Sequence, residues 1–134
     1  MIAAGRRTRA ALGLSGAGAL LVLLTGSPAL AERTPPPSRL LVNAAEWSYV
    51  LSRPELPPGP AIVELYNRGE DPHDLTIRRV GGIRERSVGE TLPDQTATIE
   101  TKLRRGSRYR LWCTLPGHLE RGMEARLKVT RKRS

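Results

Sequence analysis

Residues 113–123, Cys-Thr-Leu-Pro-Gly-His-Leu-Glu-Arg-Gly-Met, gather side chains that are scarce in the rest of this 134-residue chain. The chain has one cysteine, two histidines and, apart from Met1, one methionine, and this stretch holds Cys113, His118 and Met123. The other histidine, His73, lies upstream in the segment 67–74 (NRGEDPHD). One thiolate, two imidazoles and one thioether are the ligand set of a trigonal copper site with a weak axial methionine. This pattern points to a copper site.

The pattern of apolar residues after position 38 predicts an all-β domain. Short segments of alternating apolar and polar residues are separated by proline and glycine, which is typical of a β-sandwich or barrel. No stretch beyond the N-terminal region has a helical period of useful length. We expect seven or eight strands, with a loop over 53–60 and a turn at 81–82. The clearest strand segments are 40–51 (two strands or one bent strand), 61–66, 73–78, 96–103, 108–113 and 123–130.

The same alternation predicts where the four candidate ligands lie. Because successive side chains in a strand point to opposite faces, His73, Cys113 and Met123 fall on the apolar face of a strand or at its end. His118 belongs to the loop between the last two strands, where Pro116 and the following glycine turn the chain. We therefore expect the ligands to converge at one pole of the sandwich.

The first 31 residues have the pattern of a secretory signal peptide. Three arginines (6, 7 and 9) precede the uncharged stretch 10–26, and Ala29-x-Ala31 favours cleavage before Glu32. An uncleaved membrane anchor is the alternative, because residues 10–31 carry no charge over about the length that a membrane helix needs. The predicted organisation is a signal peptide (1–31), a proline-rich linker (32–38), one domain (39–130) and a basic tail (131–134).

Export predicts a periplasmic or extracellular location, where small proteins usually pair their cysteines. A lone cysteine cannot pair within its chain, and metal ligation by Cys113 explains its presence. The formal net charge is +9, or +6 without the three N-terminal arginines. The basic residues are dispersed and the aromatics are few, so the sequence lacks the basic stripe of a nucleic-acid-binding protein. We expect a monomer whose partners are acidic proteins or an anionic membrane surface.

These segments resemble the cupredoxins, the small blue copper proteins that include plastocyanin, azurin, pseudoazurin and amicyanin. Residues 113–118 (CTLPGH) are similar to their ligand loop, 67–73 to their first-ligand segment, and 92–97 (LPDQTA) to a turn that many of them carry. The resemblance implies a Greek-key β-sandwich that binds one copper ion through His73, Cys113, His118 and Met123.

The resemblance also implies roles for neighbours of the ligands. Many members of the family have Asn after the first histidine, where this chain has Asp74. That side chain ties the ligand segments together, so Asp74 is expected to accept a hydrogen bond from Thr114, and its charge should lower the reduction potential. An apolar docking patch around His118 is expected to consist of Leu115, Pro116 and Leu119. Trp112 either packs under the opposite face, which we favour, or offers a second exit for electrons.

The predicted function is single-electron transfer between exported or membrane-bound redox partners, without enzymatic turnover. The alternative is copper trafficking or sequestration by the same fold. A copper oxidase or nitrite reductase needs additional histidines, and a dinuclear copper centre needs two cysteines; neither is available here. Zinc is a poorer candidate, because a thioether is not among its usual protein ligands. A cysteine hydrolase lacks a third catalytic member.

Overall fold

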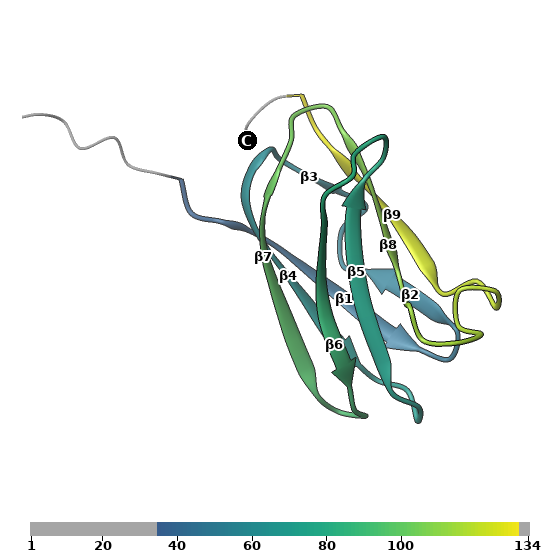
Figure 1. The fold of residues 1–134 in the computed structure, drawn as a ribbon. Helices are drawn as coiled ribbons and strands as arrows, with labels where there is room; N and C mark the ends of the chain where they lie inside the picture. The colour runs from purple at the N-terminus through teal and green to yellow at the C-terminus, as the bar shows by residue number, and fades with distance from the viewer. Residues whose placement is uncertain (1–34, 132–134) are drawn as a thin grey trace, which may run out of the picture. The chain divides into compact units, whose positions relative to one another are not determined.

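The computed structural model describes residues 35–131, which form two β-sheets (Figure 1). The predicted signal peptide, linker residues 32–34 and tail residues 132–134 lie outside this part of the chain. No helix in 35–131 is both long and apolar enough to cross a membrane. The strands are β1 (Ser38–Ala45), β2 (Ser48–Leu51), β3 (Glu55–Leu56), β4 (Gly59–Asn67), β5 (His73–Arg79), β6 (Glu85–Thr91), β7 (Thr96–Leu103), β8 (Arg108–Trp112) and β9 (Glu124–Val129).

The order of strands gives a Greek-key sandwich. One sheet has the order β2-β1-β4-β7 and the other β3-β9-β8-β5-β6. The chain crosses between sheets after β4 and returns after β6, and β4 pairs with β7. Two pairs, β1 with β4 and β3 with β9, are parallel, and the remaining pairs are antiparallel. The predicted all-β sandwich is confirmed.

The core lies between the sheets and is built by alternation. Every second residue of β4 is buried, and β1 shows the same pattern over most of its length. Burying a valine or leucine side chain stabilises the fold by about 1.5–3 kcal/mol. The largest buried aliphatic side chains come from both sheets: Leu40, Val42, Leu56, Val63, Leu65, Leu75, Leu111, Leu127 and Val129.

The structure has nine strands in its described part, whereas seven or eight were expected. Strand β6 was not predicted, because this edge strand is mostly exposed and lacks an apolar period. The predicted loop 53–60 contains β3, which pairs with the end of β9, and the start of β4. In β5 burial does not alternate, because Asp74 and Thr76 are buried like their apolar neighbours. Both side chains bond to neighbouring segments: Thr76 Oγ1 lies 2.9 Å from Ser87 Oγ, and Asp74 Oδ1 accepts from the Thr114 amide.

The strand register defines two poles of the sandwich. The ligand pole consists of the start of β5 and the β8–β9 loop. The basic pole consists of the β5–β6 turn and the β7–β8 turn, which lie together at the top of Figure 1. Thr76 of β5 is opposite Trp112 at the end of β8, whereas Arg79 is opposite Tyr109 near its start. His73 and Arg79 stand at the two ends of β5, about 20 Å apart at 3.3 Å per residue.

Candidate metal centre

Three of the four predicted ligands meet at the ligand pole. The Nδ1 atoms of His73 and His118 are 3.2 Å apart, and Cys113 Sγ is 3.4 Å from His118 Nδ1. One ligand atom from each of these residues lies within 4.8 Å of the others. His73 is distant in sequence from Cys113 and His118, so the fold itself brings the two ligand segments together.

The β8–β9 loop holds its candidate ligands through backbone hydrogen bonds within the loop. The amide of His118 donates to Leu115 O at 3.1 Å, within a turn in which Gly117 has a φ of +79°. The Met123 amide donates to His118 O, and the Cys113 amide donates to Met123 O, both at 3.1 Å. These two bonds place fully buried Met123 beside Cys113 and His118.

The cluster has the dimensions of a transition-metal site. Imidazole nitrogens bind such metals at about 2.0–2.1 Å, so two nitrogens 3.2 Å apart can both bind one ion. His73 Nε2 is buried without a hydrogen bond in the described structure, but it faces Glu46 Oε1 at 3.3 Å. This contact favours the tautomer with the proton on Nε2, an assignment inferred from the surroundings. Nδ1 of His73 is then left with its lone pair facing the cluster.

Glu46, in the turn between β1 and β2, is a neighbour of the site that the sequence did not reveal. Its Oε1 accepts hydrogen bonds from the backbone amides of Glu70 and Asp71, at 2.7 and 2.9 Å. The Asp71 amide contributes most to lowering the pKa of Glu46 to about 2. Glu46 is therefore a carboxylate at neutral pH, and it links the loop before His73 to the β1–β2 turn.

Trp47, the next residue, packs against the ligand histidines. Its ring meets that of His118 edge-on, with centroids 4.6 Å apart, and lies 6.5 Å from that of His73. The guanidinium of Arg121 is 4.2 Å from the Trp47 ring centroid. The sequence placed Trp47 only in an early strand, because nothing local to it indicates contact with a loop seventy residues later.

Asp74 makes the predicted connection to the second ligand segment. Its Oδ1 accepts a hydrogen bond from the Thr114 amide at 2.6 Å, and its Oδ2 accepts one from the Thr114 hydroxyl. The phenol of Tyr49, in β2, donates to Asp74 O. Both ligand strands are therefore fastened to each other and to the opposite sheet.

The electrostatics of the site suit a neutral imidazole and a buried sulfur. Burial is the main cause that lowers the pKa of His73. Burial likewise raises the pKa of the Cys113 thiol, while hydrogen bonds from the backbone of Asp74 and Leu115 act in the opposite direction. Backbone amides therefore point at the sulfur, where they would stabilise negative charge.

The segment before His73 depends on a buried asparagine, Asn67, to which sequence analysis gave no role of its own. Asn67 Nδ2 donates to Asp71 O at 2.8 Å and to Thr91 O at 2.9 Å. Its Oδ1 accepts from the Gly69 amide at 2.9 Å. All the hydrogen-bonding atoms of this side chain are used, so the segment 67–71 has one defined course toward His73.

The remaining predicted neighbours of the ligands lie in the ligand loop or, for Trp112, directly before it. Leu115 and Leu119 are half-buried and Pro116 is exposed, in the same loop as His118. Trp112 is half-buried, with the guanidinium groups of Arg78 and Arg110 at 5.3 and 5.4 Å from its ring centroid. These contacts favour the packing interpretation of Trp112.

No protein-family model and no curated protein matches the sequence. Solved structures do match. The dithionite-reduced auracyanin of Roseiflexus castenholzii is 17% identical, with a TM-score of 0.57 over 69% of this chain and 97% of that one. Auracyanin B is 16% identical, with a TM-score of 0.58 over 72% and 91%. Auracyanin A, a blue copper protein of Chloroflexus aurantiacus, is 14% identical, with a TM-score of 0.55 over 71% and 100%. This chain therefore has the cupredoxin fold that its sequence predicted.

Proposed function

We propose that this protein binds one copper ion through His73, Cys113, His118 and Met123 and carries single electrons. The observation that supports this most is the approach of three scarce side chains, from β5, from the end of β8 and from the β8–β9 loop, to 3.2 and 3.4 Å. A thiolate and imidazoles suit copper, and a weak axial Met is characteristic of electron-transfer sites. Bound copper supplies a one-electron couple between Cu(I) and Cu(II).

The chain's own residues contribute rigidity and an insulated environment. Cys113, His73 and Met123 are fully buried, so water is excluded from most of the site. The Asp74–Thr114 hydrogen bonds and the backbone bonds of Met123 keep the ligand segments in place. A preorganised ligand set changes little between oxidation states, which favours rapid electron transfer over enzymatic turnover.

Partner binding is proposed at the ligand pole. His118 is half-buried, and Leu115, Pro116 and Leu119 belong to the same loop. An apolar patch beside the most accessible ligand gives a redox partner a short path to the metal. We propose that the chain is a monomer and that residues 1–31 export it to the periplasm or the outer face of the membrane, where its redox partners reside.

Copper addition to the purified full chain tests the proposal. We expect an intense absorption band near roughly 600 nm from charge transfer between Cys113 and Cu(II). The band should be absent in Cys113→Ser and present in Thr114→Ser, a neighbouring control. Copper binding without this band, or a band that survives in Cys113→Ser, would refute the assignment.

Stopped-flow reduction then separates electron transfer from copper trafficking. A carrier exchanges electrons rapidly with small redox reagents and retains its metal. Slow exchange accompanied by ready transfer of copper to a chelator would instead identify a trafficking protein.

A further inference from the structure

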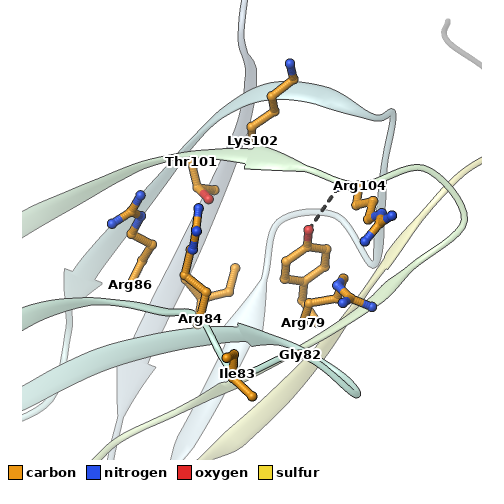
Figure 2. A pocket seen from close by; sticks show the side chains of 10 residues that line it. Arg79, Gly82, Ile83, Arg84, Arg86, Thr101, Lys102 and Arg104 are labelled. Atoms are coloured by element: carbon orange, nitrogen blue, oxygen red, sulfur yellow. Dashed lines mark hydrogen bonds between the residues drawn. The ribbon is translucent and has the colours of Figure 1, made fainter.

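A basic cavity lies at the pole opposite the metal cluster, between the β5–β6 turn and the end of β7. Its volume is about 410 Å³, and five of its lining residues are cationic: Arg79, Arg84, Arg86, Lys102 and Arg104 (Figure 2). None of its lining residues is acidic. Within residues 35–131, the ion pairs of the structure involve other cations and leave these five without a carboxylate partner. A concave surface of one charge sign attracts ligands of the opposite sign.

Exposed aliphatic side chains belong to the turn beside this cavity, and one of them, Ile83, lines it. The turn between β5 and β6 carries Val80 and Ile83, which are 52% and 98% exposed. In Figure 2 Ile83 points away from Arg84, so the apolar and cationic side chains diverge from the same turn. An exposed isoleucine side chain would contribute nothing to the binding of a small free anion. The combination of apolar insertion with arginine is typical of proteins that lie on anionic membranes.

The points at which β1 begins and β9 ends also favour an anionic membrane as the partner of this cavity. Ser38, at the start of β1, is in register with Ala61, which is in register with Thr101 of the cavity. Strand β1 therefore begins at the basic pole. At the other terminus, β9 ends beside Ser107 of the β7–β8 turn, to which the amide of Val129 is bonded. The run Arg131-Lys132-Arg133 follows this strand directly.

We propose that the basic pole binds anionic lipid headgroups, with phosphate groups in the cavity and Ile83 inserted at the membrane interface. The β5 strand then separates the membrane contact from the metal cluster by about 20 Å. His118 and its surrounding loop face away from the lipid, toward soluble partners. This inference does not depend on copper, because it uses no residue of the ligand pole.

Vesicle binding by the full chain tests the proposal. Phosphatidylcholine vesicles with and without phosphatidylglycerol are compared for wild type, for Arg84→Gln/Arg86→Gln, and for the control Arg68→Gln/Arg126→Gln. The control removes the same charge from exposed arginines that do not line the cavity. Because residues 1–34 are identical in all three proteins, their contribution to binding cancels in the comparison.

The wild type should prefer phosphatidylglycerol, and the preference should fall with added salt. The variant Arg84→Gln/Arg86→Gln should bind phosphatidylglycerol vesicles about thirtyfold more weakly. Each arginine near a membrane surface contributes about fivefold to the affinity, and two are removed. The control should lose less than about threefold in affinity, because neither of its arginines lines the cavity. Ile83→Ser, which keeps every charge, should weaken binding about fivefold.

Several results would overturn the proposal. These are equal binding to the two kinds of vesicle, equal losses in the two double variants, or thermal stabilisation by inorganic phosphate without any vesicle preference. The last result would identify a site for a small anion. The visible copper band, recorded on the same variants, should be unchanged, so a failure of membrane binding is distinguishable from a failure of copper binding.

Discussion

Oε1 of Glu46, in the turn between β1 and β2, lies 3.3 Å from Nε2 of His73, at the start of β5 in the opposite sheet. The carboxylate is fixed from the other side by the amides of Glu70 and Asp71. Carboxylates that face the outer nitrogen of a metal-bound histidine orient the ring and increase its basicity. We infer that Glu46 positions His73 for metal binding.

Glu46→Gln tests this role, because glutamine keeps an oxygen that can accept from both amides while removing the charge. We expect copper affinity to fall about 10–100-fold, with little change in thermal stability. Competition titration with a copper chelator measures the affinity. Glu120→Gln, an exposed carboxylate in the ligand loop, is the control. If both variants lose affinity equally, the effect is one of net charge and Glu46 has no special role.

Asp74→Asn is predicted to raise the reduction potential. Asp74 places a negative charge beside the Cys113 segment, and this charge stabilises Cu(II) relative to Cu(I). Its loss should raise the potential by up to about 60 mV, the equivalent of a tenfold change for one electron. Protein-film voltammetry measures the shift. Asp94→Asn, at an exposed turn, should leave the potential unchanged; absence of any rise in Asp74→Asn contradicts the electrostatic argument.

The two tryptophans should report differently on metal binding. Trp47 packs on His118 with ring centroids 4.6 Å apart, whereas Trp112 lies against Arg78 and Arg110. Copper should therefore quench Trp47 fluorescence more strongly than that of Trp112. Trp47→Phe should remove most of the metal-dependent quenching and Trp112→Phe should retain it, in a titration followed at the tryptophan emission. The reverse pattern would show that Trp47 is not beside the metal.

Asn67→Asp is predicted to destabilise the fold, because the carboxylate cannot donate to Asp71 O and Thr91 O. Leaving buried acceptors unpaired costs about 1–3 kcal/mol. For a domain of this size that corresponds to a fall in Tm of about 4–8 °C per kcal/mol. Calorimetry of the metal-free protein measures the change. Asn43→Asp, at a half-buried position of β1, is the control. An equal loss of stability in this variant would mean that the Asn67 hydrogen bonds contribute nothing.

Sequence reasoning succeeded where the signal is local and chemically rare. His73, Cys113 and His118 were identifiable from residue type and spacing, and strict alternation marked strands such as β4 and β9. Glu46 and Trp47 were missed because their contacts depend on how the β1–β2 turn packs against distant loops. Strand β6 was missed for a different reason. An exposed edge strand is specified by hydrogen bonds to its neighbour, which leave no periodic trace in the sequence.

The basic cavity was equally inaccessible to sequence reasoning. Arg84 and Lys102 come from segments that the Greek key brings together, and along the chain their charges are interspersed with acidic residues. Charges of both signs are mixed along the sequence, but in the folded protein the cations of the cavity are grouped without acidic residues. Only the fold shows which cations lack carboxylate neighbours.

The backbone bonds from Cys113 to Met123 and from Met123 to His118 close the β8–β9 connection upon itself. This connection is consequently stabilised by hydrogen bonds among its own residues. We expect that its exposed residues can be substituted while the strands beneath it remain intact. Three of the four proposed ligands can therefore be altered together by changes confined to residues 113–123.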